Sequence, residues 1–133
     1  MTLFQRALAC LVACGALGGA TAANDAPMPE RTELKRTALT ATGPMEVISS
    51  TLEFPPGTEL RRHFHHGIES GYVLQGALIQ RPGSAPERFE TGTPILNLRD
   101  VHHGGFKIVG NTALKIFTVH VVDRDKPLYE YTD

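Results

Sequence analysis

The sequence predicts an all-β domain, an antiparallel sandwich or barrel built from short strands. Strand-like runs recur between turn signals from Leu34 onwards, and no long stretch after residue 22 has a clean helical period. Nine prolines and thirteen glycines in 133 residues fit frequent turns better than a helical bundle. Many short strands at regular spacing are typical of antiparallel sandwiches and barrels.

The individual strands are predicted from local alternation and from the turn signals between them. Met45–Phe54 alternates apolar and polar residues, with Ile48, Leu52 and Phe54 on one side, and a Pro-Pro-Gly-Thr turn ends it. Further strands are predicted at Leu60–His65, Gly71–Leu74, Ala77–Gln80, Glu87–Glu90, Pro94–Leu98 and Leu114–Val122. The last is the clearest because β-branched and aromatic residues dominate it. Gln75-Gly76 is predicted to be a hairpin turn. Interior side chains are predicted at Phe54, Ile79, Leu96, Phe106, Ile116 and Phe117.

Residues 1–22 predict a secretory signal peptide. A charged start is followed by the apolar stretch Ala7–Ala20 and by a small-x-small cleavage site that ends at Ala22. Cleavage would give a periplasmic or secreted protein without a transmembrane span, because a spanning helix needs roughly 20 apolar residues. A buried N-terminal helix is the alternative, but no amphipathic period supports it. Leu11–Cys14 resembles a lipoprotein signal box, so a lipid anchor at Cys14 stays open as a second alternative.

The remainder of the chain predicts a single domain. We expect an N-terminal arm and first strand in 23–44, with a flexible lead-in up to about Arg31, the β-barrel in 45–123 and a C-terminal tail in 124–133. A net charge of -1 without any basic block excludes a nucleic-acid-binding surface. Both cysteines, Cys10 and Cys14, precede the predicted cleavage site, so the mature protein has no disulfide. Any metal must therefore be bound by nitrogen and oxygen atoms.

The histidines form two clusters that predict a metal site. All six lie between positions 63 and 120, and the first cluster contains His63 and His65, which share one face of an extended strand. Glu69 follows closely and adds a carboxylate, while the second cluster, at His102 and His103, can supply a third imidazole. Imidazoles with a carboxylate suit a divalent transition metal such as Fe, Mn, Ni, Cu or Zn.

The first cluster resembles the first motif of the cupin family, G-x5-H-x-H-x3,4-E-x6-G. Every fixed position of the motif is present, at Gly57, His63, His65, Glu69 and Gly76. Its specificity is high because five positions match within twenty residues, and the two cupin motifs together cover about half of the mature chain.

The second cupin motif, G-x5-P-x-G-x2-H-x3-N, is only partly present. Counting from Gly92 places its histidine at His103, but Leu98 replaces the proline, Asp100 the glycine and Lys107 the asparagine. Asp tolerates the left-handed backbone that glycine often adopts, so the turn can persist. Neighbours on a strand face opposite ways, so one of His102 and His103 is expected at the metal, and the motif spacing selects His103.

The resemblance implies a small antiparallel jelly-roll β-barrel with His63, His65, Glu69 and His103 as ligands of one divalent transition metal ion. It further implies a metal-dependent enzyme acting on a small organic molecule, with dioxygenase-like oxidoreductases of the quercetin-dioxygenase-like type favoured. The alternatives are a non-catalytic module that binds a small ligand and a structural cupin whose metal only stabilises the barrel. Small cupins often dimerise through an edge strand, for which residues 34–40 are available.

Other polar residues receive simpler interpretations. His120 is expected to be a hydrogen-bonded core histidine that could also line the pocket, and His66 a solvated neighbour of the site or an outer hydrogen-bond partner. Arg61 and Arg62 can attract an anionic substrate, but a solvated strand end explains them equally well.

Overall fold

The computed structural model describes residues 27–39 and 43–132, and these residues are built from strands and loops. This confirms the predicted all-β class. The predicted signal peptide, Cys10 and Cys14 lie outside the described residues. Within the described ranges there is no helix that is long and apolar enough to cross a membrane.

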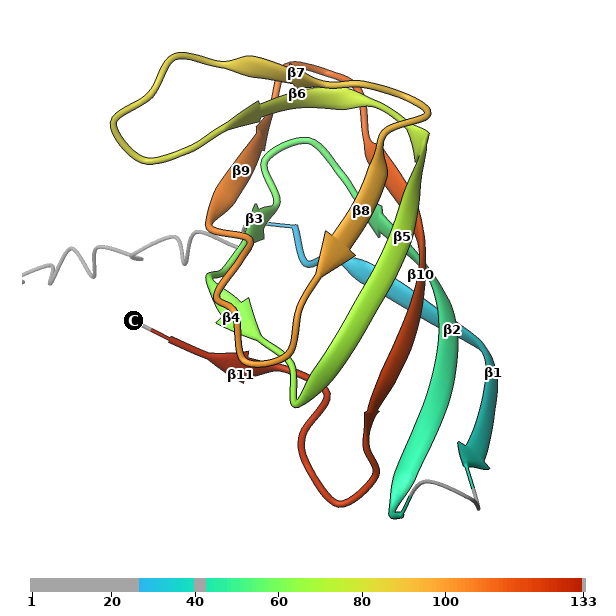
Figure 1. The fold of residues 1–133 in the computed structure, drawn as a ribbon. Helices are drawn as coiled ribbons and strands as arrows, with labels where there is room; N and C mark the ends of the chain where they lie inside the picture. Colours follow the sequence, from blue (N-terminus) through green and yellow to red (C-terminus); the bar gives the residue numbers. More distant parts are fainter. Residues whose placement is uncertain (1–26, 40–42, 133) are drawn as a thin grey trace, which may run out of the picture.

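Two antiparallel sheets face each other and enclose the interior, as the ribbon in Figure 1 shows. The larger sheet has the strand order β1-β2-β10-β5-β8, and the smaller one has the order β3-β9-β6-β7. The larger sheet comprises β1 (Glu30–Leu39), β2 (Met45–Phe54), β10 (Leu114–Asp123), β5 (Gly67–Gln75) and β8 (Pro94–Asn97). The smaller comprises β3 (Glu59–Leu60), β9 (Phe106–Val109), β6 (Ala77–Gln80) and β7 (Glu87–Phe89). A short pair, β4 (His63–Phe64) with β11 (Glu130–Tyr131), closes one end.

The apolar core lies between the two sheets because β2 and β10 alternate strictly between buried and half-buried residues. The buried cluster consists of Leu52, Phe54, Val73, Ala77, Ile79, Phe106, Ile108, Leu114 and Ile116. This confirms the predicted interior positions of Phe54, Ile79, Phe106 and Ile116. The prediction for Leu96 was wrong, because its side chain is 65% exposed on the outer face of β8. Phe117 is also outside the buried cluster, since it alternates with the inward-facing Ile116.

Gly76 connects the two sheets and is not the predicted hairpin turn. The strand before it, β5, pairs with β10 and β8, whereas the strand after it, β6, pairs with β7 and β9. A Cβ atom at this glycine would lie 2.4 Å from the carbonyl oxygen of Phe89 and 2.7 Å from the amide nitrogen of Thr91. The crossover therefore depends on close backbone contact that only glycine permits.

Four further differences concern the strands near the two chain ends and around the two histidine clusters. The strand predicted at 60–65 is divided at Arg61 and Arg62, because β3 pairs with β9 and β4 pairs with β11. Strand β1 begins at Glu30, within the predicted lead-in, and lies antiparallel to β2 at the end of the sheet order. The predicted C-terminal tail contributes β11, and β9 was not predicted, because such short strands exist only through their pairing partners.

Candidate metal centre

His63 and His65 face the interior from β4 and the residue next to its end. Both are buried. Phe64, which lies between them, and His66, which follows them, are half-buried, as the two-residue period of an extended chain requires. The backbones of His63 and His103 are joined by two hydrogen bonds, of 3.0 and 2.8 Å, which place the second cluster directly opposite the first.

Glu69 and His120 reach the same place from the larger sheet. They are direct partners in the β5–β10 register, and both side chains are buried. The site therefore lies where the short β4–β11 pair meets the middle of β5 and β10. Figure 1 shows these strands next to each other at the lower part of the barrel.

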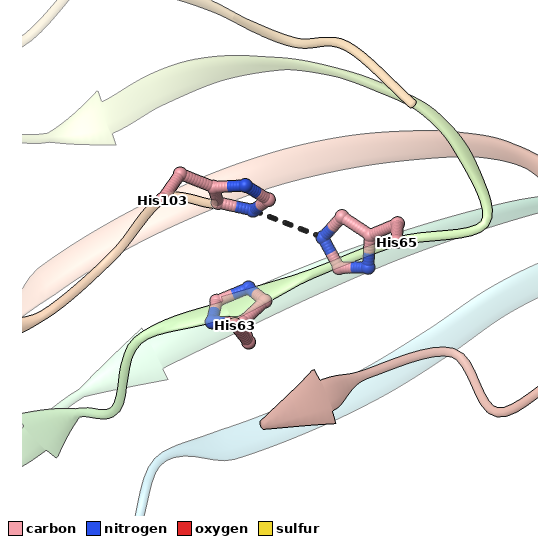
Figure 2. Close-up of side chains that lie close together, drawn as sticks. All are labelled: His63, His65 and His103. Atoms are coloured by element: carbon pink, nitrogen blue, oxygen red, sulfur yellow. Dashed lines mark hydrogen bonds between the residues drawn. The ribbon is translucent and has the colours of Figure 1, made fainter. Parts of the chain in front are cut away.

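The donor atoms of these residues lie close together. Figure 2 shows the rings of His63, His65 and His103 turned toward one another, and Nε2 of His103 lies 3.1 Å from Nε2 of His65. Oε2 of Glu69 lies 3.4 Å from Nε2 of His65 and 3.3 Å from Nε2 of His103. Ligand atoms of His63, His65 and His103 all fall within 4.8 Å of one another, and so do those of His65, Glu69 and His120.

Backbone carbonyls accept hydrogen bonds from three of the imidazoles and so fix the orientation of their rings. The Nδ1–H group of His63 donates to the carbonyl of Arg61 at 2.8 Å, and that of His103 donates to the carbonyl of Val101 at 2.9 Å. Nδ1 of His65 donates in the same way to the carbonyl of Leu128. A carbonyl only accepts, so Nε2 of each ring is left with its lone pair directed at the centre. Two such lone pairs 3.1 Å apart need a proton or a metal ion between or beside them, and a divalent metal ion fits this donor set.

Electrostatics at the centre favour an ionised Glu69 carboxylate and a neutral His63 imidazole. Burial alone would raise the pKa of Glu69, but the adjacent imidazoles of His103 and His65 outweigh it, and Nδ2 of Asn97 donates to Oε2 at 2.6 Å, so the pKa is lowered. Burial, together with the neighbouring imidazoles, lowers the pKa of His63 to about 4. Burial would also lower the pKa of His103, yet its bonds to Glu69 and Val101 prevail and raise it.

The other two histidines lie outside the centre. His102 is exposed, packs its ring against Phe64 and has Nδ1 3.2 Å from Oγ1 of Thr132. His66 lies between two carboxylates: its Nδ1 is 3.3 Å from Oδ1 of Asp100, and its Nε2 is 3.3 Å from Oε1 of Glu130. The structure thus places His63, His65 and His103 in one group of possible donors and His65, Glu69 and His120 in another, with His102 outside both. Binding of one ion by His63, His65, Glu69 and His103 stays a prediction.

The turn before His103 keeps its backbone shape although the second motif is incomplete. Asp100 has a φ of 61° and is the residue other than glycine that has positive φ in the described part of the chain. Its amide donates to the carbonyl of His65 at 3.0 Å, which ties the turn to the first cluster. The predicted tolerance of Asp for the left-handed conformation is confirmed.

Comparison with known proteins gives the family. Residues 20–120 match the profile described as the ChrR cupin-like domain. The chain belongs to this cupin family. Searching curated proteins gave no significant match.

Solved structures share the fold of this cupin at low sequence identity. A double-stranded β-helix protein from Klebsiella pneumoniae is 18% identical, with a TM-score of 0.57 over 84% of this chain and 88% of that one. The polyketide cyclase RemF from Streptomyces resistomycificus is 20% identical, with a TM-score of 0.57 over 79% of this chain and 71% of that one. A cupin domain from Bordetella pertussis is 19% identical, with a TM-score of 0.50 over 71% and 94% of the two chains. These similarities establish the jelly-roll fold.

An inner cavity of about 180 Å³ adjoins the centre. His63, Glu69 and His103 form its polar wall together with Asn97 and Tyr129, and the remaining wall is mostly apolar. Burial raises the pKa of Tyr129 to about 12, so its hydroxyl is protonated at neutral pH. The cavity gives a small organic molecule access to the centre.

A wider, open cavity of about 910 Å³ lies at the mouth of the inner one. The two share Arg81, His103, Gly104 and Phe106 in their walls. The outer cavity is lined by cationic side chains from separate segments, namely Arg61, Arg62, Arg81 and Lys107, with Glu59 as its carboxylate.

Sequence reasoning missed three residues of the site. Asn97 and Tyr129 carry no local signal, because a single Asn or Tyr in a strand or loop is common. His120 was interpreted as a hydrogen-bonded core histidine, but neither ring nitrogen has a hydrogen-bond partner within the described residues. Its separation from Glu69 along the chain hides a contact that the β5–β10 register creates.

Proposed function

We propose that this cupin is a metal-dependent enzyme of the cell envelope that acts on a small organic molecule, with dioxygenase-like oxidoreductase chemistry favoured. The observation that carries the proposal is the group of ligand atoms of His63, His65 and His103, with Oε2 of Glu69 3.3 Å from Nε2 of His103. Of these residues, His63, Glu69 and His103 line the inner cavity. A structural metal site is usually closed, whereas a catalytic one opens onto a space for the substrate. The apolar signal-peptide pattern of residues 1–22 supports export.

The four residues would hold one divalent ion through three imidazole nitrogens and a carboxylate oxygen. When bound, Fe, Ni or Cu would supply oxidation chemistry with dioxygen, whereas Zn or Mn would supply Lewis-acid chemistry. RemF supports the proposal because it is named as an enzyme, a polyketide cyclase, on the same fold. Fold similarity leaves the reaction itself open.

The protein's own groups define what happens around the ion. Asn97 fixes the Glu69 carboxylate by a 2.6 Å hydrogen bond, so that Oε2 faces His65 and His103 while Oε1 faces His120. The apolar walls exclude water from the reacting atoms. The Tyr129 hydroxyl, which has no hydrogen-bond partner in the described part of the chain, is available to donate to an oxygen atom of the substrate.

Metal analysis tests the proposal first. The protein is purified without a histidine tag, and bound metal per chain is measured by mass spectrometry for the wild type, His65→Ala and His103→Ala. His102→Ala is the matched control, because that imidazole lies outside the centre. We expect near-stoichiometric metal in the wild type and the control and its loss in both other variants. A wild type that stays metal-free after supply of Fe, Mn, Ni, Cu and Zn would overturn the proposal of a metal-dependent enzyme. It would favour the alternative of a barrel that binds a small ligand.

Two further measurements address the chemistry and the location. Consumption of dioxygen by the Fe-, Ni- or Cu-loaded protein, in the presence of small aromatic acids and diols, is expected for the oxidoreductase. Mass spectrometry of the protein from fractionated cells distinguishes the locations. A chain that begins at Ala23 indicates a free exported protein, an acylated Cys14 indicates a lipoprotein, and an intact Met1 argues against export.

A further inference from the structure

His120 has the least satisfied side chain of the centre. Its ring is 0% exposed, and neither Nδ1 nor Nε2 has a hydrogen-bond partner within the described residues. A buried polar group without a partner is destabilising, and native structures contain few of them. Leu or Phe would fill the same space without that cost. The imidazole therefore requires a binding partner of another kind.

The position of His120 indicates which partner this is. Nε2 lies 3.4 Å from Oε1 of Glu69, and its ring centroid lies 4.6 Å from that of His65. His63 and His103 come from other segments, the β4 strand and the loop before β9, and their ligand atoms group with those of His65. His65 belongs to both sets of converging donors, so the two sets form one continuous centre.

We propose that His120 is a fifth donor to the metal ion, approaching from β10 beside Glu69. This inference rests on the proposed metal centre and extends it beyond the residues of the two cupin motifs. An ion held by five protein donors has one open position in an octahedral shell, whereas an ion held by four has two. The fifth donor would restrict how dioxygen and an organic substrate can share the ion.

The experiment counts the coordinating imidazoles in the wild-type protein. With cadmium-113 bound to protein labelled with nitrogen-15, scalar coupling identifies every imidazole nitrogen that is bonded to the ion. We expect coupling to Nε2 of His63, His65, His103 and His120 and none to His102. Coupling to the first three without His120 would overturn the inference and leave the proposed function intact. Absence of bound cadmium and of every other metal would overturn both.

A variant provides a second readout. His120→Gln keeps a polar side chain of similar reach, and His102→Gln is the matched control. We expect the Kd for Zn²⁺, measured by chelator competition, to rise about tenfold or more in His120→Gln and to stay within about twofold in the control. A similar Kd for His120→Gln and the wild type, with unchanged circular dichroism, would contradict the assignment.

The cationic mouth is a separate feature that indicates the charge of the substrate. Arg62 precedes β4, Arg81 follows β6, and Lys107 lies in β9, so three distant segments place cations around one opening. Carboxylates partly balance them, since Glu87 pairs with Arg81 and Glu59 is the register partner of Lys107. Positive groups remain in excess, and such an excess attracts anions to an opening.

We infer that the substrate is a small organic anion with an apolar body. The apolar body would occupy the inner cavity, and the anionic group would lie among the cations of the mouth. A dry cavity of roughly 150 Å³ holds benzene. The inner cavity, at about 180 Å³, thus accommodates one aromatic ring or a body of similar size. This inference also rests on the proposed function, because it assigns the substrate of the same site.

Phenylacetate and its neutral analogue phenylacetamide test the inference. Their binding is measured by calorimetry on the Zn-loaded protein and again after removal of the metal with EDTA. We expect phenylacetate to bind about tenfold more tightly in both states, because several exposed cations each contribute a modest attraction. The double variant Arg62→Gln/Lys107→Gln should remove most of the preference, whereas Arg124→Gln, outside both cavities, should not.

The alternatives give different results. A preference that occurs only with Zn bound would mean that the carboxylate binds the ion, and this overturns the role of the mouth. Equal binding of the acid and the amide would overturn the anionic substrate class. The EDTA-treated state keeps the test independent of the proposed enzyme, since it needs no bound metal.

Discussion

Replacing Asn97 with Leu tests whether the Glu69 carboxylate is held in place for metal binding. Nδ2 of Asn97 donates to Oε2 over 2.6 Å, and the acceptor is an ionised, buried carboxylate. Hydrogen bonds to charged groups contribute about 1.5–3 kcal/mol. Leu has a similar volume, so the change removes the bond without opening a large cavity. The pKa of Glu69 should rise, because the lost hydrogen bond stabilises the ionised form of the carboxyl group.

Metal affinity is the readout that separates this role from packing. Loss of a group that orients a metal ligand typically weakens metal binding by about 10–100-fold. We therefore expect the Kd for Zn²⁺, measured by chelator competition at neutral pH, to rise within that range. Asn111→Leu is the matched control, because Asn111 is exposed and remote from the centre in the turn before β10. An Asn97→Leu protein with native circular dichroism and a Kd within about twofold of the wild type would refute the reasoning.

Three more predictions concern stability. In EDTA, the free energy of unfolding should fall between pH 6.5 and pH 4, by about 3 kcal/mol for each of His63 and His120. The reason is that the pKa of each residue is lowered to about 4 in the folded protein, which favours the neutral form. Urea titrations that give the same free energy of unfolding at pH 7 and pH 5 would contradict this. Gly76→Ala should cost more than about 2 kcal/mol in the same assay, since its Cβ would lie 2.4 Å from the Phe89 carbonyl, whereas Gly83→Ala, with positive φ but open space, should cost about 1 kcal/mol. Relative to protein that is kept at a free metal concentration of about 100 times Kd, the metal-free protein should have a free energy of unfolding lower by about 3 kcal/mol. Its Tm, measured by calorimetry, should be lower by roughly 10 °C.

The pH prediction includes opposing contributions, which determine its window. A depressed folded pKa in a histidine means that the unfolded chain binds more protons between the two pKa values, so stability is complete above pH 6.5 and is lost on acidification. Glu69 adds to this loss at lower pH, because its lowered pKa gives stability above its ordinary value that disappears as it is protonated. The raised pKa of His103 acts in the other direction. Two imidazoles outweigh one, so the net result is a loss.

The sequence predicted those parts of the fold and site that depend on local periodicity. The alternation of β2 is a two-residue pattern, and the same period places His63 and His65 on one interior face. The left-handed backbone at Asp100 is likewise a property of one residue type in a turn. Each of these features depends on neighbours within a few residues, and such features are visible in a single sequence.

The features that sequence reasoning missed depend on which strands pair. Gly76 was interpreted as a hairpin because it lies between two strand-like runs, but those strands belong to different sheets. His120 is brought to Glu69 only by the β5–β10 register. Leu96 is apolar yet faces outward, because its inward-facing neighbours on β8 are Ile95 and Asn97. A strand of four residues is too short for its composition to show which alternate side chains face the interior.

The distribution of polar groups within the barrel explains why its two ends differ physically. One end of the interior is an apolar cluster built on residues such as Phe54, Ile79 and Leu114. The other contains several imidazoles, a carboxylate and buried hydroxyls, such as those of Ser50 and Thr118, that have no hydrogen-bond partner among the described residues. Such groups lower the stability of a barrel unless a bound species satisfies them. His63, one of the proposed ligands, lies on β4, which pairs with β11 over only two residues on each strand. Few contacts and unsatisfied polar groups favour local opening, so order at this end should depend on occupancy of the centre. The apolar end maintains the fold, and the polar end can therefore accept a donor set that is unfavourable without its ligand.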